Sequence, residues 1–88
     1  MKTIHKFPIK ITDDQTVIME VGAEILTVQM QRGEPFLWAI VNTGNELEDR
    51  NIEVIGTGHP IEGTNRKYIG TFQTHDGQLV FHVFEYLS

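Results

Sequence analysis

The segment from Gly56 to Pro60 contains the residue types in this chain that are best suited to hold an anion. Glycines stand on both sides of Thr57, and His59 and a proline follow. Successive backbone N–H groups in such a loop can form an anion-binding nest. The Thr57 hydroxyl and the His59 imidazole would add donors. The competing hypothesis is a tight turn after a strand, where glycine supplies dihedral angles that other residues disfavour.

Cationic residues lie close to this segment in the sequence, with Arg50 before it and a basic pair after it. An arginine guanidinium matches the geometry of a phosphate group. The segment matches neither the phosphate loop nor the dinucleotide fingerprint, because it has no Gly-Lys-Ser/Thr and no following helix. The candidate ligand-binding residues, for a phosphate-bearing small molecule, are Thr57, Gly58, His59, Arg66 and Lys67.

The sequence predicts no metal site, no cofactor and no enzymatic activity. None of the four histidines has a metal-ligand spacing such as HxH or HExxH. His82 lies in an apolar segment and is expected to be half-buried and hydrogen-bonded, whereas His75 lies in a predicted turn. The absence of cysteine excludes thiolate ligands and cysteine nucleophiles. Carboxylates that sit in predicted turns, such as Asp13 and Asp14, are usually solvated.

The elements that position these residues are expected to be strands, because the dominant pattern is period-two alternation interrupted by glycine. The expected strands are 6–11, 15–21, 24–31, 35–42, 50–56, 68–74 and 78–86. Polar residues with glycine predict loops at 42–49 and 57–66. No segment has apolar residues at helical spacing over three turns. The pattern predicts one all-β domain over residues 1–88, a small antiparallel barrel or sandwich of about six to seven short strands.

Two hairpins stand out in this pattern. One turns at Arg32–Glu34, and the other turns at His75–Gly77, which contains the strong hairpin dipeptide Asp-Gly. The segment from Phe36 to Val41 is apolar on both faces, which is typical of a central strand covered on both sides. We therefore expect Trp38 to be largely buried. The surplus of apolar strand face in so short a chain also predicts a homo-oligomer, most simply a dimer.

Charge and hydropathy limit the partners. The formal net charge is −5, so the chain lacks the clustered basic face that duplex nucleic acid requires. The negative net charge is compatible with an acidic surface that mimics nucleic acid. No apolar run approaches the length of a membrane span and no signal peptide is recognisable. A cytoplasmic location is expected, with no membrane partner.

Several segments together resemble a family of small, mostly uncharacterised proteins encoded by bacteriophages and prophages. They are MKTIHK, GAEILTVQ, LWAIV, GTGHP, YIGTFQ and LVFHVFE, and they cover nearly the whole chain. The resemblance implies a phage accessory protein in the host bacterial cytosol. It carries no catalytic signature.

Three functions follow as expectations from this resemblance and from the residues. The first is a non-enzymatic counter-defence factor that inhibits a bacterial immune effector by direct contact, as anti-CRISPR proteins do. The second is an oligomeric sponge that sequesters a nucleotide immune signal at the Gly56–Pro60 loop. The third is a small virion or structural protein. A contiguous acidic face would favour the first, and free cations beside a concave loop would favour the second.

Overall fold

The protein is an all-β domain of seven antiparallel strands. The computed structural model describes residues 1–87, and no helix occurs within them. The strands are β1 (Lys2–Pro8), β2 (Asp14–Glu20), β3 (Glu24–Gln31), β4 (Glu34–Asn42), β5 (Leu47–Gly56), β6 (Arg66–Thr74) and β7 (Leu79–Tyr86). The predicted fold class is confirmed. Because there is no helix at all, this part of the chain also holds none that is long and apolar enough to cross a membrane.

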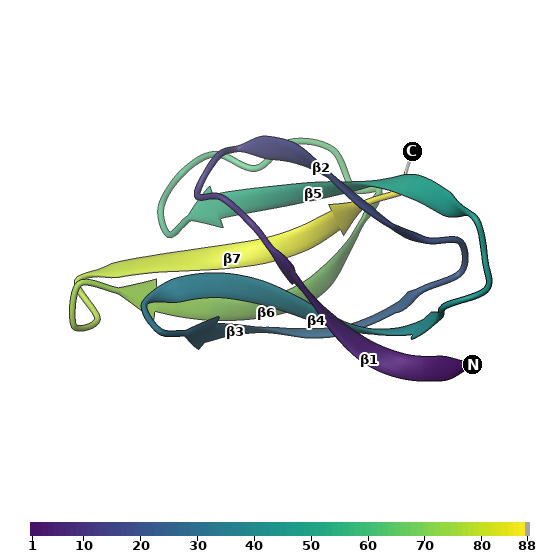
Figure 1. Cartoon of the computed structure of the whole chain (residues 1–88). Helices are drawn as coiled ribbons and strands as arrows, with labels where there is room; N and C mark the ends of the chain where they lie inside the picture. Colours follow the sequence, from purple (N-terminus) through teal and green to yellow (C-terminus); the bar gives the residue numbers. More distant parts are fainter. Residues whose placement is uncertain (88) are drawn as a thin grey trace.

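The strands form two sheets that face each other. One has the order β1-β4-β3 and the other the order β2-β5-β7-β6. The chain passes from one sheet to the other after β1, after β2 and after β4, as the ribbon in Figure 1 shows. The edge strands β3 and β6 belong to different sheets and pack against each other, which closes one side of the sandwich.

Residues that alternate along each strand fill the space between the sheets. Val28, Leu37 and Val41 come from the three-stranded sheet, and Met19 and Ile52 come from the four-stranded sheet. This alternation follows from strand geometry, because successive side chains point to opposite faces. The full buried apolar set is Ile9, Val17, Met19, Ala23, Val28, Leu37, Ala39, Val41, Ile52, Val54, Phe72 and Val83.

The two sheets approach each other closely at Gly70 in β6. A Cβ atom added at this glycine would lie 2.9 Å from Cγ1 of Val28 in β3. The register shifts between Ile25 and Thr27 in β3 and between Tyr68 and Gly70 in β6. Such bulges bend a strand and increase its twist. Glycine and the two bulges therefore allow the edges of the two sheets to approach.

Both predicted hairpins are present at the predicted turns. In the β3–β4 turn, Arg32 and Gly33 have φ values of 52° and 80°. In the β6–β7 turn, the three residues His75, Asp76 and Gly77 all have positive φ. Glycine and aspartate tolerate this left-handed region better than most residues. The turn residues thus account for both hairpins.

Trp38 is half-buried and lies outside the core, although the sequence predicts a strand covered on both sides. β4 is the central strand of its sheet, as predicted, but only one of its faces lies in the core. Leu37 and Ala39 point into the core, whereas Trp38 lies on the outer face between Phe36 and Ile40 and is only partly covered. The indole Nε1 of Trp38 is covered but has no hydrogen-bond partner within residues 1–87.

Several strand boundaries differ from the expected ones by a residue or two, among them the start of β6 at Arg66, and two strands differ by three or more residues. The first strand was expected at 6–11 and instead covers Lys2–Pro8. Its inward positions hold Thr3, His5 and Phe7, so the apolar alternation is weak there. The strand expected at 50–56 begins three residues earlier, at Leu47, because β2 pairs with the polar residues at its start.

A buried ion pair closes one end of the sandwich. Arg50 in β5 donates from Nε and Nη2 to the two carboxylate oxygens of Glu85 in β7, and its Nη1 donates to the carbonyl of Ala23 at 2.9 Å. The Arg50 and Glu85 side chains are only 17% and 10% exposed. These hydrogen bonds to Glu85 raise the pKa of the Arg50 guanidinium above its usual value. The pair therefore joins two strands of one sheet to the connection that leads into the other.

Candidate functional site

The segment Gly56–His59 forms a four-residue turn. The backbone N–H of His59 donates to the carbonyl of Gly56 at 3.1 Å, and Gly58 has a φ of 89°. The imidazole of His59 folds back over Gly56, and a Cβ added at Gly56 would lie 3.5 Å from that ring. The N–H of Thr57 donates to the carbonyl of Val80 at 3.1 Å. Of the backbone N–H groups of Thr57, Gly58 and His59, which would line an anion-binding nest, those of Thr57 and His59 therefore already donate to backbone carbonyls.

Arg66 holds the loop of residues 57–65 against the four-stranded sheet. Its Nε donates to Oε1 of Glu53 in β5 at 2.9 Å. Its Nη atoms donate to the backbone carbonyls of Gly63, at 2.9 Å, and Glu62. The hydrogen bond to Glu53 raises the pKa of the Arg66 guanidinium above its usual value. Arg66 therefore lies beside the loop, as expected, but its donors are occupied by the protein itself.

Replacing Arg66 with alanine is expected to loosen the 57–65 loop. The side chain is only 10% exposed and joins the loop to β5, so its removal frees two carbonyls and the Glu53 carboxylate. Limited proteolysis should show faster cleavage within residues 57–65 in this variant. Lys67→Ala is the matched control, since no ion pair or side-chain hydrogen bond of Lys67 occurs among the described residues. Equal cleavage rates in both variants would show that Arg66 does not hold the loop.

A hollow of about 620 Å³ lies between this loop and the outer face of the four-stranded sheet. Its apolar wall is formed by Ile55, Pro60, Ile61 and Tyr86. Its polar lining holds more acidic than basic side chains, namely Asp13, Asp14, Glu53 and Glu62 against Arg66, with His59 at the loop. The hollow is therefore strongly acidic, which favours a cationic group over a phosphate.

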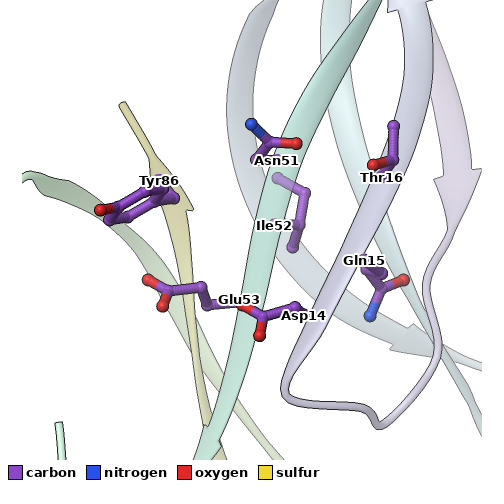
Figure 2. Close-up of a pocket in the computed structure, with 7 residues that line it drawn as sticks. All are labelled: Asp14, Gln15, Thr16, Asn51, Ile52, Glu53 and Tyr86. Atoms are coloured by element: carbon purple, nitrogen blue, oxygen red, sulfur yellow. The ribbon is translucent and has the colours of Figure 1, made fainter. Parts of the chain in front are cut away.

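Two of these carboxylates lie directly opposite each other on neighbouring strands. Asp14 in β2 pairs in register with Glu53 in β5. Figure 2 shows their side chains next to each other, with the ring of Tyr86 from β7 on the other side of Glu53. Like charges directly opposite in a sheet are destabilising. Arg66 compensates Glu53, but no ion pair of Asp14 occurs within residues 1–87.

The structure separates the candidate residues into two groups. Thr57, Gly58, His59 and Arg66 all lie in or beside the loop that covers the hollow. Lys67 points to the other face of the sheet, where it lines a different hollow of about 350 Å³ together with Arg50 and Glu85. The acidic residues Asp13 and Asp14 were not among the candidates. Nothing in the sequence near these two carboxylates indicates that Asp14 lies opposite Glu53.

A row of hydrogen-bonded polar side chains lies on the same outer face, beyond the hollow. The hydroxyls of Tyr68 and Thr71 are 2.6 Å apart, and Thr71 Oγ1 lies 3.1 Å from Nδ1 of His82. The other ring nitrogen, Nε2, lies 2.6 Å from the hydroxyl of Thr57. His82 is thus half-buried and hydrogen-bonded on both sides, as expected. We call these four residues the polar row.

The fold and the site define a small all-β sandwich with an acidic hollow and a polar row on one outer face. The chain belongs to the family DUF7352, a domain of unknown function, whose family model matches residues 1–88. No curated protein and no solved structure matches the chain.

Proposed function

We propose that this protein is a non-enzymatic binding protein that acts by direct contact with another protein in the bacterial cytosol. In this proposal it is a phage counter-defence factor, which blocks an immune effector by occupying a basic surface. The observation that carries the proposal is the acidic hollow on the outer face of the four-stranded sheet. An acidic surface of this kind complements the basic channels that bind nucleic acid, and such complementarity speeds association.

The chemistry of the hollow fits an arginine or lysine side chain from a partner. Its carboxylates can accept charge-assisted hydrogen bonds. Its apolar wall, which includes Ile55, Ile61 and Tyr86, can cover the aliphatic stem of such a side chain. A bound cation would also relieve the repulsion between Asp14 and Glu53. Local arrangements that cost stability are typical of functional sites.

The geometry supports the protein-binding hypothesis over the nucleotide sponge. A sponge needs free donors at the loop, but the N–H groups of Thr57 and His59 donate to backbone carbonyls. Arg66 is engaged by Glu53 and by two loop carbonyls. The carboxylates of the hollow would also repel a phosphate. We expect cyclic dinucleotides and cyclic trinucleotides not to bind in a calorimetric titration.

The double variant Asp13→Asn and Asp14→Asn is expected to abolish function while leaving the fold intact. Bacteria carrying single immune systems would express the protein and be challenged with a phage that each system restricts. The wild type should restore phage plating against at least one system, and the double variant should not. Because it removes the charge opposite Glu53, the double variant should be as stable as the wild type or up to about 1 kcal/mol more stable.

Asp76→Asn is the matched control for this experiment. Asp76 lies in the exposed β6–β7 turn with a φ of 55°, a conformation that asparagine also tolerates. This variant should restore plating as well as the wild type does. The proposal is contradicted if the wild type restores plating against none of the systems, or if the double variant is as active as the wild type.

The expected homodimer stays a prediction. The outer face of the three-stranded sheet carries Ile4, Phe36, Trp38 and Ile40, which is the surplus apolar surface that motivated it. Lys6 in β1 covers part of this face, because its ammonium lies 4.8 Å from the centre of the Phe36 ring. Sedimentation at micromolar concentration would distinguish a dimer from the 10.1 kDa monomer.

A further inference from the structure

The direction of the hydrogen bonds in the polar row can be worked out from its geometry. A neutral imidazole has one N–H donor and one acceptor nitrogen, and each hydroxyl has one proton. The hydroxyl of Thr57 lies 3.4 Å from the carbonyl oxygen of Val80, which can only accept. If Thr57 donates there, His82 must donate to Thr57 from Nε2. Nδ1 of His82 then accepts from Thr71, and Thr71 accepts from Tyr68.

This direction uses one more hydrogen bond within the protein than the reverse direction does. In the reverse case Thr57 donates to His82, His82 donates to Thr71, and Thr71 donates to Tyr68. The Val80 carbonyl then accepts only the backbone N–H of Thr57 and not its hydroxyl proton. The first direction satisfies every proton of the row inside the molecule. The count of internal hydrogen bonds therefore favours the tautomer of His82 with its proton on Nε2.

A row in this direction presents only acceptors to its surroundings. The Tyr68 hydroxyl donates inward and keeps its lone pairs free, and the hydroxyl of Thr71 keeps one more. Tyr68 is 58% exposed, so these lone pairs can be reached from outside. We infer that the polar row is a second contact point for the partner, and that it accepts hydrogen bonds from an arginine of that partner. This inference rests on the proposed function.

The register of the sheet places the row and the acidic hollow in line. Asp14, Glu53, Phe84 and Tyr68 follow one another across β2, β5, β7 and β6 on the same outer face. Phe84 contacts Tyr68 edge to face, with 5.5 Å between the ring centres. The row therefore continues the acidic surface towards β6 with neutral acceptors. A basic segment lying across the strands can place one arginine at the hollow and another at Tyr68.

The first test measures the protonation of His82 directly. Long-range ¹H–¹⁵N correlation spectra distinguish a ring nitrogen that carries a proton from one that does not. At a pH where His82 is neutral, the proton is expected on Nε2, with Nδ1 unprotonated. A proton on Nδ1 would overturn the inference, because Thr71 would then donate to Tyr68 and the Tyr68 hydroxyl would donate outward.

The second test uses an acetylated and amidated hexa-arginine peptide as the probe. Titration into ¹⁵N-labelled protein should shift the signals of Tyr68, Thr71 and His82 as well as those around Asp14. Thr71→Val and Tyr68→Phe should each weaken binding about three- to tenfold, the scale of one hydrogen bond. Both replacements suit a strand, so the variants should fold. Thr43→Val, in the β4–β5 connection, is the control and should bind like the wild type.

The outcomes separate this inference from the proposed function. If the peptide shifts only the signals around Asp13 and Asp14, or if Thr71→Val and Tyr68→Phe bind as the wild type does, the inference is wrong and the hollow remains a contact site. If the peptide does not bind at all, the inference is also wrong. The proposed function is judged by the plating assay, which does not depend on the polar row.

Discussion

Glu85→Ala is expected to destabilise the protein by about 2–4 kcal/mol, measured as the free energy of unfolding in urea. The substitution removes the carboxylate that accepts two hydrogen bonds from Arg50 and leaves that guanidinium charged at a largely buried position. Breaking a fully buried pair costs somewhat more, and we expect less here because Arg50 keeps some contact with solvent.

Two further variants show whether the loss comes from an orphaned charge. Glu48 also lies near Arg50, at 3.8 Å, but its side chain is 39% exposed. Glu48→Ala should therefore cost no more than about 1 kcal/mol. Replacing the pair together, with Arg50→Met and Glu85→Leu, should recover most of the stability that Glu85→Ala loses. A cost below about 1 kcal/mol for Glu85→Ala itself would contradict the role assigned to the pair.

Leu37→Ala is expected to cost about 2–5 kcal/mol, the usual range for emptying a leucine site in a core. Leu37 is fully buried in β4, where it lies opposite Val28 on one side and Phe7 on the other. The cavity would form between the two sheets, away from the acidic hollow and the polar row. Urea unfolding would measure the loss of stability. If the variant still restores phage plating at a low temperature, where it remains folded, the site is intact.

The neighbouring residue provides the contrast. Trp38 points to the outer face, and its indole N–H is covered without a partner among the residues that the structure describes. Phenylalanine keeps the ring and removes that donor, whose burial is costly. Trp38→Phe should therefore change the free energy of unfolding by less than about 1 kcal/mol. If Trp38→Phe lowered the free energy of unfolding much more than Leu37→Ala did, Trp38 and not Leu37 would lie on the core face of β4.

The sequence was sufficient for the strands and the hairpins because their signals are local. Gly33 and Gly77 occupy positions with positive φ, and the alternation on either side of them marks the paired strands. The expected start of the first strand is too late because its local signal is weak. Its inward residues include Thr3 and His5, which do not stand out as a core pattern.

Which face of a strand enters the core, and which strands it pairs with, depend on residues far apart in the sequence. β4 is apolar on both faces, so its pattern predicts cover on both sides, whereas only the face with Leu37 enters the core and Trp38 lies on the other face. The acidic hollow depends on the pairing of Asp14 with Glu53, which lie far apart in the sequence. The hold of Arg66 on the 57–65 loop also depends on β5, because Glu53 in that strand accepts a hydrogen bond from Arg66. Candidate residues chosen by sequence proximity therefore included Lys67, which faces elsewhere.

The outer face of the four-stranded sheet is the surface on which the proposed function depends. Its acidic end lies under the 57–65 loop and its neutral end lies at Tyr68. Both ends accept hydrogen bonds, and both suit a basic partner. The opposite outer face is apolar along β4, with lysines on β1 and polar residues on β3, and suits a different kind of contact.

Hydroxyl-radical footprinting of the bound protein tests this assignment most directly. The protein would be purified together with its target from cells in which it restores phage plating, and its oxidation would be compared with that of the free protein. The account predicts protection of His59, Tyr68 and Tyr86, with no change at Trp38. Protection of Trp38 without protection of Tyr68 and Tyr86 would contradict it and would move the contact surface to the three-stranded sheet.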